Sequence, residues 1–265
     1  MRDISDLRQR QALPLNAKVL MSQNRIREWY EYWQGDVCIS FSGGKDSTVL
    51  AHIVHTMYPE VPLVFSNTGL EYPEIQKFAR EMGAEFVRPK MSFSEVISTY
   101  GYPIISKNVA DAISYARTII KERKTLHSRT DDRRDALRGK NSKSMFNKTK
   151  WRQLCDNTQF LIGDKCCEVM KKNPLKMYQK KTNRKPFIGV LAEESLQRTT
   201  NWIMRGCNAY DGREPKSLPL SIWTEQDVLK YIKDNQIEIC SVYGHCGRGQ
   251  LWLSIRSDSG NRLQA

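Results

Sequence analysis

The stretch that decides the fold of this chain runs, from residue 40 to residue 47, Ser40-Phe41-Ser42-Gly43-Gly44-Lys45-Asp46-Ser47. It follows an apolar run at 36–39 that predicts a buried strand, and it precedes residues 48–54, which predict the start of a helix. Free backbone N–H groups and the positive end of the helix dipole both point at such a turn. Adjacent glycines let the backbone approach a ligand closely. We therefore expect the turn to bind a phosphate chain.

The side chains of this turn suit phosphate as well. Hydroxyl groups add donors, and Lys45 adds a point charge. An aspartate beside the lysine suits a Mg²⁺ ion that bridges Asp46 to the phosphates. The order differs from the Walker P-loop, which needs G-x-x-x-x-G-K-[ST]. The alternative is an ordinary glycine-rich turn between a strand and a helix. We predict Lys45 and Asp46 as catalytic residues, and we predict these phosphate-binding residues: Ser40, Ser42, Gly43, Gly44 and Ser47.

The order S-x-S-G-G-K-D-S resembles the PP-loop of the adenine-nucleotide α-hydrolase-like superfamily. That superfamily includes the N-type ATP pyrophosphatases and the phosphoadenosine phosphosulfate (PAPS) reductases. The resemblance covers residues 35 to about 243 and rests on four ordered motifs. It implies an adenine nucleotide as ligand, either ATP or PAPS, with Mg²⁺ on Asp46.

A second motif, residues 65–74, looks like the D-T-G-x-x-F/Y-P-E segment of PAPS-reductase-like proteins, with Asn67 in place of the usual aspartate. In the family this segment lies by the adenosine. The resemblance thus implies that Asn67, Thr68, Gly69 and Glu71 bind the nucleotide. The structural alternative is a turn that uses Asn67 or Thr68 to cap the next helix.

A third motif, residues 188–198, is similar to the family's G-x-x-x-x-E-S-x-x-R segment. The resemblance implies that Ser195 and Arg198 contact the phosphates or sulfate of the nucleotide. For Arg198 taken alone, a surface salt bridge is the alternative.

A fourth motif, residues 165–175, resembles the family's C-C-x-x-x-K-x-x-P-L segment. In cluster-bearing members the cysteine pair supplies two thiolates to a four-iron four-sulfur cluster, and a later C-x-x-C supplies the other two. The resemblance therefore implies Cys166 and Cys167 as metal ligands. The sequence contains no C-x-x-C and no E-C-G-[IL]-H, the cysteine motif of the reductases. We expect the tail 244–265 to be truncated or altered relative to such proteins. This leaves an incomplete cluster, a cluster completed by Cys207, Cys240 and Cys246 if the fold brings them to the cysteine pair, or buried free thiols.

Hydrophobic patterns predict strands at 36–41, 61–66, 84–89 and 187–192, and helices at 17–34, 46–57, 73–82, 92–100, 108–124 and 224–233. The β-α-β-α-β order predicts an α/β fold with a doubly wound, mainly parallel sheet, a basic helical insertion and a C-terminal helical extension. In such a sheet ligands bind at the carboxyl ends of the strands. We therefore expect the first three motifs to converge on one site. We expect Trp202 and Trp223, with Tyr210, in the core.

We predict an N-terminal helical segment at 1–34, a nucleotide-binding domain at 35–243 and an atypical tail at 244–265. The net charge is +13, and residues 121–152 carry twelve Lys and Arg against four acids. This segment suits a solvated basic surface, a flap over the nucleotide or a contact with nucleic acid.

Composition excludes other classes. No run of eighteen apolar residues exists, so we expect no membrane span, and the charged N-terminus is unlike a secretory signal. We therefore expect a cytoplasmic protein, and seven cysteines argue against a disulfide scaffold there.

Three functional hypotheses follow. The first is an enzyme that cleaves ATP to AMP and pyrophosphate to activate an acceptor, with sulfur transfer as a following step. The second is a sulfonucleotide reductase. The third is a non-catalytic subunit that binds nucleotide or nucleic acid.

Overall fold

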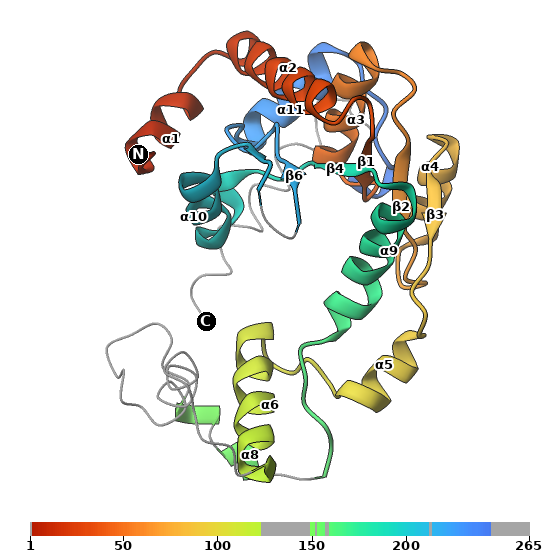
Figure 1. Cartoon of the computed structure of the whole chain (residues 1–265), viewed down its shortest axis with the longest axis vertical. Coiled ribbons are helices and arrows are strands. Elements are labelled where there is room, and N and C mark those ends of the chain that lie inside the picture. Colours follow the sequence, from red (N-terminus) through yellow and green to blue (C-terminus); the bar gives the residue numbers. More distant parts are fainter. Residues whose placement is uncertain (1, 123–148, 152, 157–158, 212–213, 245–265) are drawn as a thin grey trace. The chain divides into compact units, whose positions relative to one another are not determined.

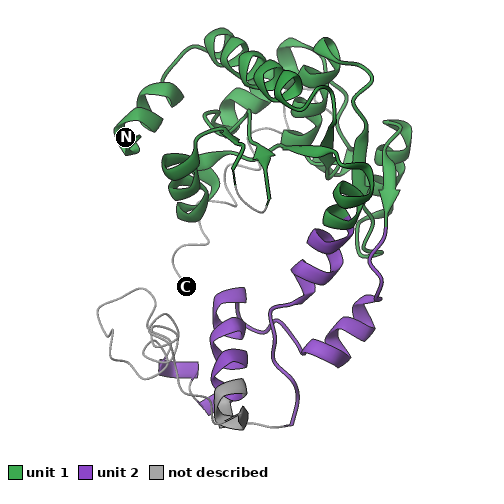
Figure 2. Cartoon of the chain, viewed as in Figure 1, with its two compact units in different colours: residues 1–87, 175–265 green, residues 88–174 purple. Residues whose placement is uncertain are grey.

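The computed structural model describes residues 2–122, 149–151, 153–156, 159–211 and 214–244. The chain forms two compact units, residues 1–87 with 175–265 and residues 88–174 (Figure 2). Each unit has a hydrophobic cluster of its own. The larger unit carries the sheet and the motif at 40–47. The predicted division at residues 34 and 243 stays a prediction.

The larger unit alternates strands and helices along the chain (Figure 1). Its elements are α1 Ile4–Gln11, α2 Leu15–Tyr32, β1 Val37–Phe41, α3 Lys45–Met57, β2 Leu63–Ser66, α4 Pro73–Glu81, β3 Glu85–Val87, α9 Asn173–Thr182 (which begins two residues before the boundary), β4 Lys185–Ile188, the 3-10 turn η3 Ala192–Glu194, α10 Leu196–Arg205, β5 Asn208–Ala209, β6 Lys216–Ser217, α11 Glu225–Asp234 and the 3-10 turn η4 Ser241–Tyr243.

The strands form one six-stranded sheet in the order β3-β2-β1-β4-β6-β5. All neighbouring pairs are parallel except β5 and β6. Ile39 of β1 pairs with Leu63 of β2 on one side and with Phe187 of β4 on the other. The strand order therefore reverses between β1 and β4, the position where open α/β sheets bind ligands. The predicted α/β class with a mainly parallel sheet is confirmed.

The core of this unit packs around β1 and α3. Helices α2 and α11 both contact α3, and α2 also reaches β6. Trp29 of α2 and Trp223, just before α11, are both completely buried. Trp202 of α10 is 2% exposed, so the prediction that Trp202 and Trp223 belong to the core is confirmed. Burial of each such large side chain contributes on the order of 1.5–3 kcal/mol.

Most predicted elements lie within two residues of the observed ones. The clearest difference is the fourth strand, which we predicted at 187–192 and which occupies Lys185–Ile188. The chain leaves the sheet at Gly189 and makes a 3-10 turn from Ala192 to Glu194. The helix predicted at 224–233 is confirmed, because Thr224 caps α11 and forms a capping box with Asp227. Helix α1 lies within the N-terminal helical segment predicted at 1–34, whereas α9 and α10 were not predicted.

The smaller unit is helical. It contains α5 Phe93–Tyr100, α6 Lys107–Glu122, the 3-10 turn η1 Thr149–Trp151, α8 Gln153–Asp156 and the π-helix η2 Glu168–Lys172. Ser92 caps α5 with a capping box, and Ile113 of α6 packs in the cluster of this unit. The helices predicted at 92–100 and 108–124 are confirmed. Most of the basic segment 121–152 lies outside the described residues.

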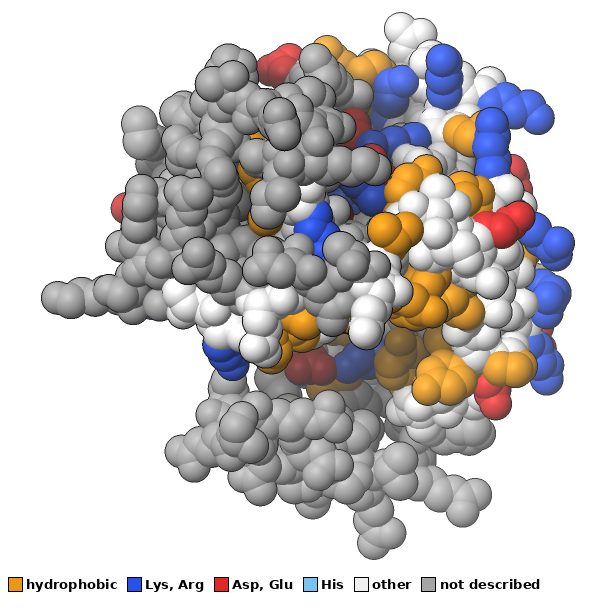
Figure 3. Space-filling model, turned by 90° about the horizontal axis from the view of Figure 1, so that it is seen from below, with side chains coloured by type: hydrophobic (Ala, Val, Ile, Leu, Met, Phe, Trp, Pro, Cys, Tyr) orange, Lys and Arg blue, Asp and Glu red, His pale blue; other side chains and the backbone are white. Residues whose placement is uncertain are grey.

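Figure 3 shows one face of the molecule. Among the residues that the structure describes, lysine and arginine side chains lie along one edge of this face, beside a group of hydrophobic side chains. In the part of the chain that the structure describes, no helix has the length and apolar character needed to cross a membrane.

Candidate functional site

The loop between β1 and α3 has the shape that the sequence predicts. Gly44 is the N-cap of α3 in an extended conformation, and α3 begins at Lys45. Gly43 has φ +72°, and a Cβ there would lie 2.8 Å from Cγ2 of Ile75 in α4. A side chain at position 43 is therefore opposed both by the backbone angle and by its neighbour. Ser40 lies inside β1, where it pairs with Val64 and Ile188.

Hydrogen bonds brace this loop from the inside. The Ser47 hydroxyl donates to the carbonyl of Gly44 (2.9 Å) and lies 3.1 Å from the hydroxyl of Ser42. The N–H of Gly44 donates to the Ser42 hydroxyl (3.3 Å). The N–H groups of Lys45, Asp46 and Ser47 open the helix, and groups at these positions have no partner within it. The loop is therefore an anion cradle with donors to spare.

The end of β4 is pressed against the same helix start. A Cβ on Gly189 would lie 2.8 Å from the carbonyl oxygen of Asp46 and 3.0 Å from the nitrogen of Ser47. Only glycine lets the third motif approach the first this closely. The sequence contains this glycine within the third motif, but the pattern gave no reason to assign it a role.

Lys45 has a partner that the sequence did not predict. Its Nζ lies 2.7 Å from Oε1 of Glu225, the first residue of α11. The N–H of Glu225 in turn donates to Oε1 of Glu193, in η3 (2.7 Å). The starts of α3 and α11 and the turn after β4 therefore meet at one corner.

Asp46 sits in the middle of this corner. Burial raises the pKa of its carboxyl group above the ordinary value of 3.8. The positive charges of Lys45 and Arg198 oppose this rise, and the negative charges of Glu225 and Glu193 add to it. The first and third motifs are therefore within electrostatic reach of one another. A partly buried carboxylate beside a phosphate cradle favours a cation between the two, and Mg²⁺ commonly binds one carboxylate together with substrate phosphates.

The start of α11 is held firmly. Lys18 of α2 is 2% exposed, and its Nζ lies 2.6 Å from Oδ2 of Asp227. The same ammonium donates to the carbonyl of Gln11 (2.5 Å), and Asp227 also accepts from the hydroxyl of Thr224. This buried network fixes the position from which Glu225 reaches the loop.

The second motif forms a closed turn after β2. The Glu71 carboxylate accepts from the N–H (2.9 Å) and the hydroxyl (2.7 Å) of Thr68. The Asn67 side-chain oxygen accepts from the N–H of Gly69 (2.9 Å). Asn67 and Thr68 are buried. Neither caps α4, since Tyr72 is the N-cap and makes no side-chain hydrogen bond there.

The predicted pair Ser195 and Arg198 lies at the start of α10. The Ser195 hydroxyl caps this helix by accepting from the N–H of Arg198 (3.3 Å). The Arg198 guanidinium pairs with Glu194. Both residues thus have local structural partners, although Arg198 still acts on the charge of Asp46.

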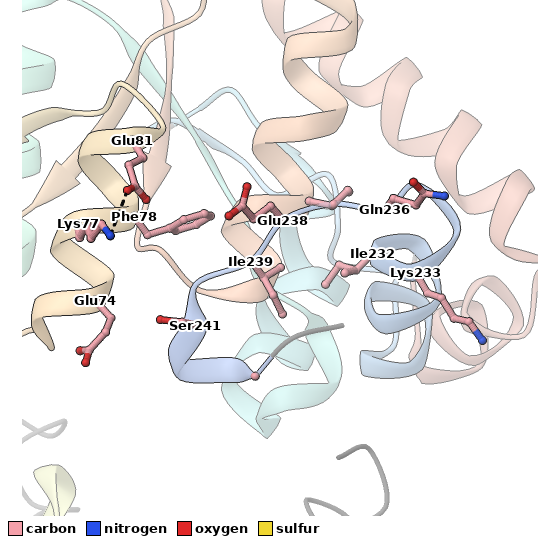
Figure 4. Close-up of a pocket in the computed structure, with 12 residues that line it drawn as sticks. Glu74, Lys77, Phe78, Glu81, Ile232, Lys233, Gln236, Glu238, Ile239 and Ser241 are labelled. Atoms are coloured by element: carbon pink, nitrogen blue, oxygen red, sulfur yellow. Dashed lines mark ion pairs between the residues drawn. The ribbon is translucent and has the colours of Figure 1, made fainter. Parts of the chain in front are cut away.

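A pocket of about 660 Å³ lies between α4 and residues 232–244 (Figure 4). In the close-up, Phe78 points from α4 toward Ile239. Both walls of the pocket also reach the loop at 40–47. Ile75 of α4 lies against Gly43, and the Tyr243 hydroxyl would lie 3.5 Å from a Cβ on Gly44. Tyr243 is a second neighbour of the loop that sequence reasoning missed.

The described residues contain no group of three or more His, Cys, Asp or Glu side chains that could hold a metal ion. Among these residues the cysteines therefore form no complete metal centre. Cys166 is half-buried and Cys167 is exposed in the smaller unit. In the larger unit, Cys207 contacts the Ser221 hydroxyl (3.3 Å), and Cys240 is 1% exposed in the core. Cys246 lies outside the described residues, so the cluster stays a prediction.

Comparisons with known proteins found one matching domain family and a few distant relatives. The model of the phosphoadenosine phosphosulfate reductase domain matches residues 36–102 and 104–246. A segment of 84 residues, 29% of this chain and 18% of the relative, is 33% identical to an uncharacterised protein of Methanocaldococcus jannaschii. A segment of 69 residues, 25% of this chain and 28% of the relative, is 32% identical to a phosphoadenosine 5'-phosphosulfate reductase of an Enterobacter species. The matched segments span less than a third of either relative.

Two solved structures resemble the chain at low identity. A PAPS reductase from Candida auris in complex with phosphate aligns with a TM-score of 0.47 and 14% identity, over 83% of this chain and 82% of that one. A U34-tRNA thiolase from Methanococcus maripaludis with its 4Fe–4S cluster aligns with a TM-score of 0.40 and 16% identity, over 92% of this chain and 70% of that one.

Proposed function

Because the chain belongs to the phosphoadenosine phosphosulfate reductase family, we propose that it binds an adenine nucleotide at the loop 40–47 and cleaves ATP to AMP and pyrophosphate, thereby activating an acceptor. The observation that carries the proposal is the intact phosphate cradle, with Gly43 at positive φ, unpaired N–H groups at the start of α3 and Lys45 beside them. The pocket of Figure 4 is the proposed place for the nucleoside.

The proposed reaction is a displacement at the α-phosphorus. An acceptor oxygen forms a bond to the α-phosphorus, the bond from that phosphorus to the bridging oxygen breaks, and pyrophosphate leaves with the electron pair. The Lys45 ammonium and the N–H groups at the start of α3 stabilise the charge that develops on the leaving group. When bound to Asp46, Mg²⁺ would neutralise phosphate charge. In the step that we propose to follow, a sulfide-level sulfur nucleophile forms a bond to the activated acceptor, the bond from the acceptor to the adenylate oxygen breaks, and AMP leaves with the electron pair.

Binding requires Lys45 to change partners. In the structure its ammonium is paired with Glu225 at 2.7 Å, and the two side chains are 24% and 59% exposed. An arriving phosphate competes with that carboxylate for the same cation. The pair therefore holds Lys45 close to the loop while leaving it exchangeable, because a partly exposed ion pair contributes little stability, about 0–1 kcal/mol.

The second candidate is a sulfonucleotide reductase acting on PAPS or its unphosphorylated relative. The closed turn of Asn67 to Glu71 and the cysteine pair are the features shared with that class, and the absent E-C-G-[IL]-H motif argues against it. A non-catalytic binding subunit would bind nucleotide without any turnover.

Equilibrium binding of Mg-ATP and of PAPS to anaerobically purified protein tests the proposal, with AMP and pyrophosphate assayed in the same samples. We expect tighter binding of ATP with slow pyrophosphate release, which Lys45→Ala abolishes. Lys230→Ala is the matched control, since Lys230 is an exposed lysine on α11 that pairs with Asp234. A preference for PAPS with no pyrophosphate release would overturn the proposal in favour of the reductase, and binding without turnover would favour the subunit.

A further inference from the structure

A second pocket in the larger unit is lined by arginines. It has a volume of about 180 Å³ and lies between the two N-terminal helices and the end of α10. Its lining includes Arg2, Arg10, Arg25, Glu28, Trp202 and Asn208. Ser195 caps the opposite end of α10, which is ten residues long, so the two ends of this helix are about 15 Å apart. The arginine pocket is therefore a separate place from the corner at Lys45.

Two of the arginines are held against α10. The Arg10 guanidinium lies 5.9 Å from the ring centroid of Trp202. The Arg2 guanidinium covers Gly206, where a Cβ would lie 2.7 Å from its Cζ. Gly206 has φ +73° at the C-cap of α10. The glycine thus ends the helix and also leaves the space that the Arg2 guanidinium occupies.

The charges of the pocket are not balanced by its surroundings. Glu28 is the acid in the lining, and it pairs with Arg25 at 2.6 Å. The described residues provide no ion pair to Arg2 or Arg10. Two acids follow Arg2 closely in the sequence, the N-cap Asp3 and Asp6 in the first turn of α1, and each accepts the other's backbone N–H in a capping box.

Trp202, which also lines the pocket, has a buried indole N–H. Trp202 is 2% exposed, and its Nε1 has no hydrogen-bond partner among the described residues. The Asn208 side-chain nitrogen, in contrast, donates to the carbonyl of Arg25 (2.9 Å). The buried indole N–H groups of Trp29 and Trp33 likewise have no partner among the described residues, so the Trp202 donor does not single out this pocket. The guanidinium groups of Arg2 and Arg10, which have no ion pair among the described residues, are what favour an anionic ligand.

We propose that this pocket binds a tetrahedral oxyanion group, a phosphate or a sulfate, through Arg2 and Arg10. Guanidinium groups match the oxygens of such anions in two parallel hydrogen bonds, and these bonds are stronger than neutral ones. A volume of 180 Å³ holds a tetrahedral anion together with water. The group arrives either as a free inorganic anion or as the phosphate of a nucleotide.

Calorimetric titration of the full chain with inorganic phosphate, sulfate and AMP at low ionic strength tests the proposal. In a Lys45→Ala background, which weakens the cradle at 40–47, we expect phosphate and sulfate binding to persist. Adding Arg10→Gln or Arg2→Gln should weaken that binding about tenfold or more, as expected for loss of a charge-assisted hydrogen bond. AMP binding tighter than phosphate in this background would identify the nucleotide as the source of the group, and equal or weaker binding would identify the free anion.

Arg8→Gln provides the matched control. Arg8 is an exposed arginine on α1 that does not line the pocket. If all three arginine variants lose the same affinity, the effect comes from net charge and the proposal fails. If Arg10→Gln and Arg2→Gln titrate like the parent chain, the proposal also fails. Arg2→Gln removes an exposed side chain ahead of α1, so thermal unfolding of this variant separates loss of binding from loss of folding.

Discussion

Two glycine-containing loops follow neighbouring parallel strands in this protein, and they differ in whether their backbone N–H groups are used in hydrogen bonds within the loop. The loop after β1 leads into α3 at once, so its helix N–H groups are unpaired and face the loop. The loop after β2 runs from Asn67 to Tyr72, and three of its N–H groups, those of Thr68, Gly69 and Leu70, donate to side chains of the same loop.

The comparison separates a loop that keeps helix donors available from one whose donors are largely used within the loop. Helix α4 begins with Pro73, which has no N–H, so its start offers one donor fewer than the start of α3. The Glu71 carboxylate adds negative charge to the second loop, whereas Lys45 adds positive charge to the first. We therefore propose that a phosphate chain binds the loop after β1 and that the loop after β2 forms a wall beside it.

Alanine substitution of the two glycines gives the largest contrast. Gly43→Ala should lower the free energy of unfolding by about 1–3 kcal/mol, because of its backbone angle and its contact with Ile75, and should abolish measurable nucleotide binding. Gly69 also has positive φ, at +80°, but nothing lies within 4 Å of an added Cβ. Gly69→Ala should cost about 1–2 kcal/mol and keep nucleotide binding. Denaturant unfolding and nucleotide titration measure both. Equal losses of binding would break the comparison.

Weakening the hydrogen bonds within the loop after β2 should have a smaller effect on stability and on nucleotide binding. Glu71→Gln weakens two hydrogen bonds to Thr68 and should lower the free energy of unfolding by about 1–2 kcal/mol, since one donor loses a charged acceptor. Nucleotide affinity should change less than twofold if Glu71 only braces the loop. A larger loss of affinity without loss of stability would show that Glu71 binds the nucleotide directly.

Removing the carboxylate of Glu225, which pairs with Lys45, should strengthen nucleotide binding at the loop 40–47. Glu225→Gln releases the ammonium from a partly exposed ion pair worth about 0.5–1 kcal/mol, so nucleotide affinity should rise about two- to fivefold. The gain should vanish when Glu225→Gln is combined with Lys45→Ala. Weaker binding in Glu225→Gln would instead mean that the carboxylate positions the lysine for the phosphate.

The smallest effect is a pH trend in stability. Because burial raises the pKa of Asp46, its protonated form stabilises the fold fully below pH 3.8, and that contribution is lost as pH rises through the raised pKa. Asp46→Asn imitates the protonated form. Without nucleotide, its midpoint of thermal unfolding should equal that of the parent chain at low pH and exceed it at neutral pH. A parent chain that stays as stable as Asp46→Asn at neutral pH would contradict this account.

The sequence predicted the parts of the site that depend on one strand, one turn and the helix after it. The loop 40–47 and the capping of α11 by Thr224 are local patterns, and the rule for parallel sheets correctly placed Asp46 near Arg198. Glu225 and Lys45 are 180 residues apart in the chain, and their contact depends on where α11 packs after the last strands. Strands β5 and β6 have two residues each, too few for a periodic pattern. The roles of Gly189, Glu225 and Tyr243 therefore follow from packing alone.

The burial of Lys18 predicts the order in which helices dock while the chain is made on the ribosome. Its carboxylate partner, Asp227, is 209 residues further along the chain. An ammonium in an apolar surrounding is costly without its partner, so we expect α2 to stay undocked until α11 has been made. Nascent chains halted before residue 227 should therefore remain open to protease in their first helices, and chains halted well beyond it should not. We therefore expect the first helices of the chain to be among the last to dock. The ion pair between Lys45 and Glu225 likewise forms only after α11 has been made.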